Sequence, residues 1–458
     1  MTQKAANLEN NLRLVYQTEL PVSIEEAFVW HLRKGAFERL LPPWVSADLL
    51  FSPGSPDEEK SKVGLKLKWG PFRCKWILEY RDYTFPREFS DVQVRGPFRH
   101  YLHRRRFLTI DPISSQLTDE ITYRAPLLNK KIQKEFSRLF AWQHAILRED
   151  MKVISHYHRT PLRILLSGAS GFIGSNLKIF LQLAGHEVIR LVRGREKMGE
   201  DAIYWDPIHG SVHKEDFEGF DVVVHLAGAG IAQGRWTKNK KERLFLSRCR
   251  DTWLLSHVLC HLYRPPKVLF CASAIGFYGD RSDEELMEDS PQGSGFLADL
   301  CGKWEKATEV IENRGTRVIH ARFGAVLGAK GGMLKKLLGP MHWGLGGRMG
   351  SGTQWISWIG LDDLLGACYH CLMKEEISGP VNFAAPSPLI QSEFIRILAK
   401  KLGRPAFCHL PGWLLKAALG EMAREMILSS QNAKPVKLLK TGYTFRYPDL
   451  KTALDFVM

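Results

Sequence analysis

The sequence lacks the features that mark secreted, membrane-spanning and intrinsically disordered proteins. Its eight cysteines are scattered over 458 residues without the spacing of a disulfide framework, which fits a reducing compartment. The first residues contain no apolar signal core, and no apolar run reaches the ~18 residues that a membrane helix needs. Hydrophobic residues make up 45% and charged residues 25%, as in globular chains. We therefore expect a soluble, cytoplasmic protein with no membrane span.

Acidic residues are outnumbered by basic ones, and the formal net charge is +15 at pH 7. The excess is spread over the whole chain, so it argues only weakly for acidic ligands or nucleic acid. One dense basic cluster, residues 103–106, lies in a segment with the pattern of a strand, and we interpret it as a solvated face. No nucleic-acid partner is expected.

A metal site is also not expected. Cys368 and Cys371 have the CxxC spacing of a metal-binding pair, but they lie within a helix-like run, residues 361–374. No second pair of ligands accompanies them, and a structural zinc ion needs four ligands.

The chain is too long for one ordinary core, so two or three domains are expected. In the N-terminal part, Ser23 and Glu26 have the spacing of a helix cap. A helix is predicted over residues 127–151, where apolar residues recur at helical spacing. Strands are predicted over residues 12–20, 64–69, 73–82, 87–95, 100–110 and 117–124. This α+β order, a sheet on one long helix, encloses an apolar cavity as readily as a filled core.

The most informative stretch is residues 162–176, where a short apolar run stops at glycines and an amphipathic segment follows. The glycine spacing suits a dinucleotide, because the first glycine permits a tight turn, the second admits a pyrophosphate and the third allows close packing of helix on strand. The phosphates would lie at the helix N-terminus. The residues expected to bind the cofactor here are Gly168, Ser170, Gly171, Phe172, Ile173 and Gly174.

Two further strands, residues 185–192 and 221–228, follow at the distances that a parallel α/β sheet requires. The second of them ends in Leu226, Ala227 and Gly228, which we also assign to the cofactor site. After the first come Arg193 and Arg195, where an NAD site usually carries an acidic residue. Arginine binds phosphate with bidentate, charge-assisted bonds, so NADP is predicted in preference to NAD. The alternative is a solvated basic loop.

Residues 12–155 resemble the START-like, polyketide-cyclase-type ligand-binding fold in the order of their predicted elements. The landmarks are residues 40–44, 89–91 and 96–103, which look like the version of this fold fused to a reductase-like domain. The resemblance implies a cavity for a lipidic or aromatic molecule. His100 and His103 would lie on opposite strand faces, which argues against a metal pair. A filled core without a ligand is the alternative.

Residues 162–458 resemble extended short-chain dehydrogenase/reductases, and more narrowly the atypical subfamily called "epimerase family protein". The resemblance rests on the glycine turn, on residues 273–279, and on many separated motifs in the right order, which include Arg235-Trp236-Thr237, Ser247-Arg248, Trp304-Glu305 and Gly350-Ser351-Gly352. It implies a doubly wound parallel sheet of the Rossmann type with a helical C-terminal extension. We therefore predict a START-like domain over residues 1–158, an NADP-binding domain over 159–385 and an extension over 386–458 that packs on the substrate side.

The chemistry departs from the family pattern. Typical members use a Tyr-x-x-x-Lys pair, but alignment on Glu305 places Leu297 and Cys301 at those two positions. Tyr278 and Ser273 are the catalytic residues that we assign in their place. Arg322 belongs to a strand that in relatives approaches the nicotinamide, and it is assigned to the cofactor site. A glycine- and tryptophan-rich stretch, residues 342–358, is expected to form a mobile loop over an apolar substrate, or a surface loop with core tryptophans.

The sequence thus favours an NAD(P)-dependent epimerase or reductase that acts on an unknown small molecule, with an accessory domain for a hydrophobic ligand. The alternative is a protein that binds NADP(H) as a sensor, or binds another ligand, without turnover. The missing tyrosine and lysine favour the alternative, whereas the intact glycine turn favours the enzyme.

Overall fold

The computed structural model describes residues 6–8, 11–51, 54–58, 60–69, 72–125, 129–157, 160–207 and 213–458. The chain divides into two compact units. The N-terminal unit comprises residues 1–160 with 182–185, and the C-terminal unit comprises residues 161–181 with 186–458. Over the described ranges, no helix is both long enough and apolar enough to cross a membrane.

The N-terminal unit is built on an antiparallel sheet with the strand order β1-β2-β8-β7-β6-β5-β4-β3. Its strands are β1 (Ala6–Leu8), β2 (Asn11–Leu20), β3 (Ala47–Leu49), β4 (Lys62–Trp69), β5 (Phe72–Thr84), β6 (Glu88–Arg95), β7 (His100–Asp111) and β8 (Ser114–Arg124), and its helices are α1 (Ile24–Leu32), α2 (Ala36–Arg39) and α3 (Asn129–Ser155). All six predicted strands and both predicted helices are confirmed. Ser23 caps α1 as expected, because its Oγ accepts from the N–H of Glu26 at 3.3 Å.

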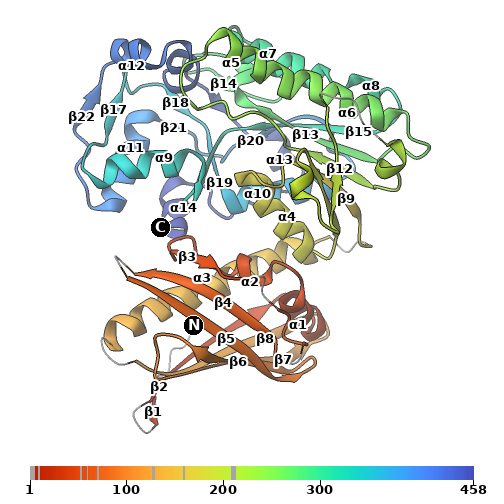
Figure 1. The fold of residues 1–458 in the computed structure, drawn as a ribbon. Coiled ribbons are helices and arrows are strands. Elements are labelled where there is room, and N and C mark those ends of the chain that lie inside the picture. The colour runs from red at the N-terminus through yellow and green to blue at the C-terminus, as the bar shows by residue number, and fades with distance from the viewer. Residues whose placement is uncertain are drawn as a thin grey trace. The chain divides into compact units, whose positions relative to one another are not determined.

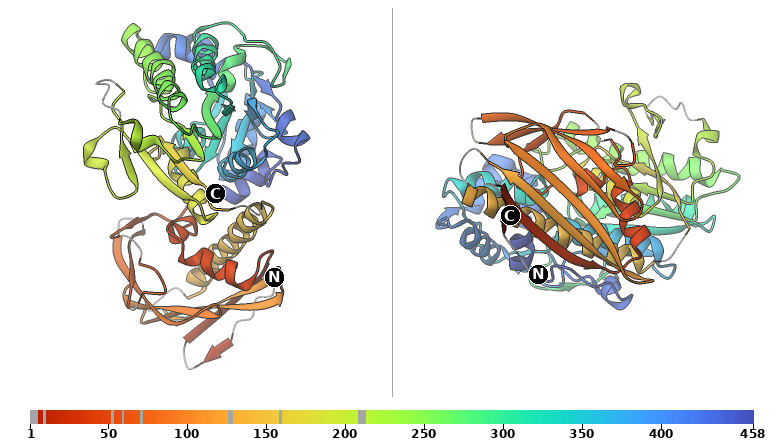
Figure 2. Two further views of the ribbon diagram at one scale, coloured as in Figure 1. Left: turned by 90° about the vertical axis from the view of Figure 1, so that its right-hand side faces the viewer. Right: turned by 90° about the horizontal axis from the view of Figure 1, so that it is seen from below.

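Helix α3 lies along one face of this sheet, which curves around it (Figures 1 and 2). Phe136 and Phe140 of α3 pack on Tyr16 and Tyr123 of the sheet, and all four are buried. The core therefore lies between the sheet and its long helix, as the sequence pattern predicts. Eight strands with one long helix agree with the expected α+β class, while the START-like classification stays a prediction.

The basic cluster at residues 103–106 is not a solvated face, so that prediction is wrong. His103 and Arg105 are each 7% exposed and point into the core, whereas Arg104 and Arg106 are half-buried. Successive strand residues face opposite sides of a sheet, so every second residue of the cluster enters the interior.

The C-terminal unit contains a parallel sheet with the strand order β11-β10-β9-β12-β13-β15-β20. These strands are β9 (Arg163–Ser167), β10 (Glu187–Val192), β11 (Ala202–Tyr204), β12 (Val222–His225), β13 (Val268–Ala274), β15 (Arg317–Phe323) and β20 (Gly379–Phe383). Helices α6 (Asp251–Cys260), α7 (Phe296–Lys306) and α8 (Glu309–Glu312) cover one face, and α4 (Phe172–Leu183) and α10 (Leu361–Met373) cover the other (Figure 1). The predicted doubly wound sheet of the Rossmann type is confirmed.

Residues 342–358 contain short strands that the expectation of a loop did not include, while the mobility of this stretch stays a prediction. They contain β17 (Gly347–Met349) and β18 (Trp355–Ile356), which pair with β22 (Cys408–Leu410) and β21 (Leu389–Ile390). Trp358, which begins β19 (Trp358–Gly360), is fully buried, as the alternative of core tryptophans predicts. The glycines here allow close backbone pairing, since a β-carbon on Gly347 would lie 1.6 Å from the carbonyl oxygen of Cys408.

The C-terminal extension belongs to the same compact unit as the parallel sheet. It contains α11 (Gln391–Leu402), α12 (Gly412–Leu419), a π-helical segment (Ala423–Ile427), β23 (Asn432–Ala433), α13 (Val436–Lys440) and α14 (Leu450–Val457). Helix α11 packs against α14 and α9 (Gly332–His342) around Phe394 and Leu398, which are fully buried. The predicted domain boundary at residue 386 remains a prediction.

Candidate cofactor and active site

The glycine turn between β9 and α4 has the geometry that a pyrophosphate requires. Gly168 has φ +73°, which favours glycine, and a β-carbon on Gly174 would lie 2.2 Å from the carbonyl oxygen of Gly168. A β-carbon on Gly171 would meet only that same oxygen, at 3.2 Å. Ser170 and Gly171 are exposed, and Phe172 and Ile173 open α4. The turn therefore presents the N–H groups of a helix N-terminus beside open space, which fits an anion.

Ser167 joins this turn to the end of β12. Its Oγ accepts from the N–H groups of Leu226 and Ala227 at 3.1 and 3.2 Å, and it lies 2.7 Å from Nδ1 of His225. A β-carbon on Gly168 would lie 2.8 to 2.9 Å from the backbone of Leu226 and Ala227. The structure thus places residues 226–228 against the glycine turn, as the assignment to one site requires. Sequence reasoning missed Ser167, although a polar residue at the end of an apolar strand was a signal.

Arg193 follows β10 and lies close to the same edge of the sheet. Its Nη2 is 3.2 Å from Oδ2 of Asp251, a buried carboxylate at the start of α6, and 48% of the Arg193 side chain is exposed. Burial, and secondly the charge of Arg193, lower the pKa of His225 to about 3. Arg193 is therefore anchored yet accessible, as a phosphate ligand must be. The side chain of Arg195 lies outside what the structure describes.

Arg322, Tyr278 and Ser273 belong to one buried network around Glu305. Arg322 donates to both carboxylate oxygens of Glu305 at 2.9 and 2.8 Å, and Ser273 donates to the same carboxylate at 2.7 Å. The Tyr278 hydroxyl accepts from Arg322 at 2.9 Å and lies 2.7 Å from Oδ1 of Asn382. Burial raises the pKa of Tyr278, whose side chain is fully buried. The network occupies the polar atoms of all three predicted residues, and their cofactor and catalytic roles stay predictions.

Leu297 and Cys301, which occupy the tyrosine and lysine positions, lie on α7 against Gly276. A β-carbon on Gly276 would lie 3.3 Å from Cβ of Leu297 and 3.9 Å from Sγ of Cys301. Burial, and secondly the charge of Glu305, raise the pKa of Cys301 to about 12, so the thiol is protonated at neutral pH. Neither side chain therefore supplies an acid that exchanges protons at neutral pH.

Arg248 supplies a positive charge close to this position, and sequence reasoning gave it no role. It lies in a π-helical segment, Leu246–Arg250, and its Cζ would be 3.4 Å from a β-carbon on Gly228. Its guanidinium lies over the ring of Trp304 at 5.1 Å, and its charge lowers the pKa of Cys301 against the larger effect of burial. Within the described residues Arg248 forms no ion pair with a carboxylate. The motif Ser247-Arg248 was the only sequence signal.

The C-terminal extension packs over the start of α7. The carboxylate of Glu425 accepts from the N–H groups of Phe296 and Leu297 at 3.2 and 2.8 Å and so caps this helix. Arg235 donates to backbone carbonyls at the end of α12, and Lys241 forms an ion pair with Glu421. These contacts place the extension beside Leu297, and its packing on the substrate side stays a prediction.

The N-terminal unit contains a second buried polar cluster, which we call the Asp119 centre. It consists of Asp91, His103, Arg105, Asp119 and His144. Asp119 accepts from Arg105 at 2.7 and 3.1 Å and lies 3.0 Å from His103 and 2.9 Å from His144. Among the residues that the structure describes, Oδ2 of Asp91 and Nδ1 of His144 are buried without a hydrogen-bond partner, as is the hydroxyl of Tyr123. The interior of the sheet is therefore not uniformly apolar.

One cluster has the composition of a metal site, namely His257, Cys260 and His261 at the end of α6. The Cys260 thiol lies 3.1 Å from Nδ1 of His261, and burial raises its pKa. A metal ligand must be a thiolate, so this shift works against metal binding. Cys368 and Cys371 are fully buried in α10, where burial likewise raises the pKa of both thiols.

Comparisons with known proteins agree with this geometry. Residues 164–384 match the NAD dependent epimerase/dehydratase family, and residues 410–457 match a domain of unknown function, DUF1731. The chain is 37% identical over 293 residues to epimerase family protein Mb2239 of Mycobacterium bovis, a match that covers 64% of this chain and 96% of that protein.

Two solved structures extend the comparison. Human epimerase family protein SDR39U1 (isoform 2), crystallised with NADPH, is 34% identical with a TM-score of 0.60 over 65% of this chain and 99% of that one. The nucleoside-diphosphate sugar epimerase of Corynebacterium glutamicum is 30% identical with a TM-score of 0.80 over 97% of this chain and 90% of that one. The second likeness therefore includes the N-terminal unit.

Proposed function

The chain belongs to the NAD dependent epimerase/dehydratase family, and on this premise we propose that it binds NADP(H) at the glycine turn and transforms a small molecule. The observation that carries the proposal is the open space over Gly171, beside a Gly174 that tolerates no side chain. The human relative crystallised with NADPH supports the choice of cofactor. When bound, the nicotinamide supplies or accepts a hydride.

The residues that would hold NADP(H) come from the three central strands. The N–H groups at the start of α4 face the pyrophosphate, residues 226–228 line the adjoining strand end, and Arg193 faces the 2′-phosphate. Asp251 fixes the Arg193 side chain, which lowers the entropy lost when the phosphate binds. The guanidinium nitrogens that do not contact Asp251 remain for the ligand.

Arg248 is the residue that we assign to the substrate oxygen. Its guanidinium lies against Gly228 and near Cys301, where the family pattern has a lysine. A fixed cation beside a developing negative charge stabilises the transition state without itself giving up a proton. Arg248 would stabilise this charge on the substrate oxygen, and water would supply the proton.

Titration calorimetry with NADPH and NADH tests the cofactor assignment. We expect NADPH to bind more tightly, and Arg193→Ala to reduce the preference by about 10-fold or more, since a hydrogen bond to a charged group contributes ~1.5–3 kcal/mol. Arg243→Ala, an exposed arginine on α5 (Lys238–Phe245), is the matched control. Equal affinities for the two cofactors would remove the assignment.

Substitution of two glycines distinguishes a loss of cofactor binding from a loss of folding. Gly171→Val should abolish NADPH binding with an unchanged circular dichroism spectrum, because the added side chain enters the pyrophosphate space. Gly174→Val should disrupt the fold as well, because its β-carbon would lie 2.2 Å from a backbone oxygen. If Gly171→Val binds NADPH like the parent, the phosphates lie elsewhere.

A second function, NADP(H) binding without turnover, is favoured by Leu297 and Cys301 in place of the family's acid pair. A screen of carbonyl compounds with NADPH, followed by Arg248→Met in any active reaction, distinguishes the two. Turnover that falls by ~10² or more in Arg248→Met, with NADPH affinity unchanged, supports the enzyme and the role of Arg248. Tight NADPH binding with no turnover across the screen supports the sensor.

For the N-terminal unit, the proposal is a START-like domain that binds a hydrophobic ligand. Its support is the sheet curved around α3, together with the likeness of the Corynebacterium glutamicum structure over nearly the whole chain. We also propose that this ligand carries a polar group. A hydrogen bond from such a group to the unpaired buried atoms of the Asp119 centre would remove the free-energy cost of leaving them unpaired. Native mass spectrometry of the purified chain, with Tyr123→Phe as the variant, would detect a retained ligand.

A further inference from the structure

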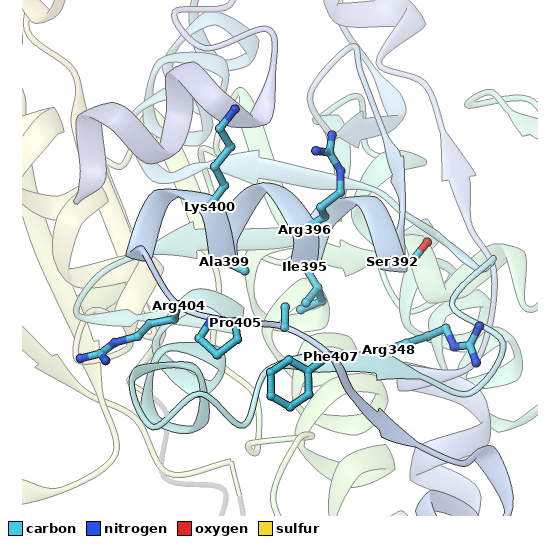
Figure 3. A pocket seen from close by; sticks show the side chains of 10 residues that line it. Arg348, Ser392, Ile395, Arg396, Ala399, Lys400, Arg404, Pro405 and Phe407 are labelled. Atoms are coloured by element: carbon cyan, nitrogen blue, oxygen red, sulfur yellow. The ribbon is translucent and has the colours of Figure 1, made fainter.

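A pocket of about 420 Å³ lies in the C-terminal unit between α11 and the segment that leads into β22. Ile395 and Ala399 of α11 form one wall, and Pro405, Ala406 and Phe407 form the other (Figure 3). The size is that of a small-molecule site. The pocket contains none of the residues of the glycine turn or of the Glu305 network, so it is separate from the proposed cofactor site.

The rim of the pocket is positively charged. Arg348 and Arg404 lie at its two ends with Phe407 between them, and Arg396 and Lys400 extend from α11 (Figure 3). Arg396 forms an ion pair with Glu393 at 2.6 Å. Arg348, Lys400 and Arg404 have no carboxylate partner among the described residues. Three exposed cations therefore remain for an anionic ligand.

Apart from Glu393, which pairs with Arg396, the two segments around the pocket contain no acidic residue. Asp and Glu are absent from residues 313–361 and 394–420, although both segments contain several lysines and arginines. The two segments pair through β17 and β22, so their positive charges lie on one face of the unit. Positive charge concentrated in this way produces a positive electrostatic potential. That potential attracts anions to this face of the unit.

The apolar side chains here are unusually exposed. Phe407 is 82% exposed, and Trp343 and Trp413 nearby in the chain are 85% and 71% exposed. Residues 343–345 approach the pocket, because a β-carbon on Gly344 would lie 3.5 Å from Pro405. Large apolar side chains beside a pocket mark a surface that another molecule covers.

From these observations we propose that the pocket binds an anionic amphiphile, a molecule with a phosphate or carboxylate head and an aliphatic body. The head contacts Arg348 or Arg404 at one end of the pocket, and the body lies along Ile395, Ala399 and Phe407. The aliphatic side chains of Ile395, Ala399 and Pro405 suit a hydrocarbon chain, because the removal of such surface from water is favourable. A second copy of the chain is disfavoured, because a two-fold contact would bring the cationic face against itself.

Calorimetric titration of the full chain with dodecyl phosphate, below its micelle concentration, tests the proposal. Dodecyl maltoside has the same chain with a neutral head, and inorganic phosphate has the head alone. We expect dodecyl phosphate to bind at least ~10-fold more tightly than either, since both halves of the site contribute. Equal binding of inorganic phosphate would mean an adventitious anion site and would overturn the proposal.

Matched variants locate the binding. Arg348→Glu with Arg404→Glu should weaken dodecyl phosphate binding by at least ~10-fold, and Phe407→Ser by about as much. Lys306→Glu with Arg314→Glu, and Tyr263→Ser, change exposed residues elsewhere in the unit and should have less than ~2-fold effect. Unchanged affinity in the pocket variants, or no binding of dodecyl phosphate at all, refutes the site.

Vesicles separate the two sources of such a ligand. Sedimentation with phosphatidylcholine vesicles, with and without phosphatidylglycerol, shows whether the chain takes the amphiphile from a bilayer. Binding only to anionic vesicles, lost in the double charge reversal, assigns the pocket to a membrane lipid. Binding to dodecyl phosphate without vesicle binding assigns it to a free amphiphile.

Discussion

Both units bury a network of charged side chains, but the two networks differ in how completely their polar atoms are paired. Around Glu305, the polar atoms of Ser273, Tyr278 and Arg322 all have partners. In the Asp119 centre, Oδ2 of Asp91 and Nδ1 of His144 have none. A fully paired network makes a rigid scaffold, whereas unpaired buried atoms are costly and gain from a ligand. The difference shows that burial of reactive residue types does not by itself identify an active site.

The comparison is tested most strongly by removing the central carboxylate of each network. Asp119→Ala and Glu305→Ala each leave a buried arginine without its partner, so each should lower the free energy of unfolding by ~3–5 kcal/mol. Urea-dependent proteolysis, with fragments of β7–β8 and of β9–β12 identified by mass spectrometry, assigns the loss to a unit. Glu19→Ala, an exposed carboxylate on β2, is the control. A loss below ~1 kcal/mol in either variant would show that its network is not ionic.

The pKa values of His103 and His225 are shifted in opposite directions, so the two residues should make stability depend on pH in opposite ways. Burial lowers the pKa of His103, but the charges of Asp91 and Asp119 outweigh it and raise the pKa to about 9. The stabilisation, on the order of 3 kcal/mol, is therefore complete below pH 6.5 and is lost as the pH rises towards 9. His225 has a pKa of about 3, so the C-terminal unit loses stability as the pH falls below 6.5, where the unfolded chain takes up a proton.

The measurement is the same proteolysis assay at several values between pH 5 and pH 9.5. His103→Gln should remove the alkaline loss in the N-terminal unit. His225→Asn should reduce the acid loss in the C-terminal unit, to which His320 also contributes because burial lowers its pKa too. A stability that is flat from pH 6.5 to 9.5 in fragments of β7 and β8 would contradict the charged state of His103.

A smaller effect is expected from Tyr278→Phe. The variant leaves Oδ1 of Asn382 and one donor of Arg322 without their partner, which should cost ~1–3 kcal/mol. As a scaffold residue, Tyr278 should leave single-turnover NADPH oxidation at the parent rate once a substrate is found. A decrease of ~10² or more with unchanged NADPH affinity would restore its predicted role as the catalytic acid.

The smallest effect is expected from Tyr123→Phe, the counterpart in the N-terminal unit. The Tyr123 hydroxyl is buried without a partner, so its removal should leave the free energy of unfolding within ~1 kcal/mol or raise it. Thermal unfolding of the two phenylalanine variants, measured side by side, gives the contrast. A large loss in Tyr123→Phe would mean that this hydroxyl has a partner in solution.

Much of the fold was predictable from local patterns. Alternating residues gave the strands of the N-terminal unit, and helical spacing gave α3, because side-chain periodicity reflects backbone geometry directly. The glycine turn was predictable for the same reason, since a side chain at Gly174 would meet Gly168, which is close in sequence, whereas the contact of Gly168 with Leu226 and Ala227 was not predictable in this way. The short strands within residues 342–358 were missed because they pair with residues 33 to 61 positions away.

What the sequence by itself determined is therefore the parallel sheet, the glycine turn and the absence of the tyrosine and lysine. Only the tertiary structure decided which polar side chains are enclosed. On β7, Tyr101 and Phe107 share a face with His103 and Arg105, while Leu102 and Leu108 share the other with Arg104 and Arg106. Each face of β7 therefore combines apolar and basic side chains. Only packing against α3 decides which of the two faces is buried. Likewise, Arg248 lies against Gly228 because two segments separate in sequence converge, which no local pattern records.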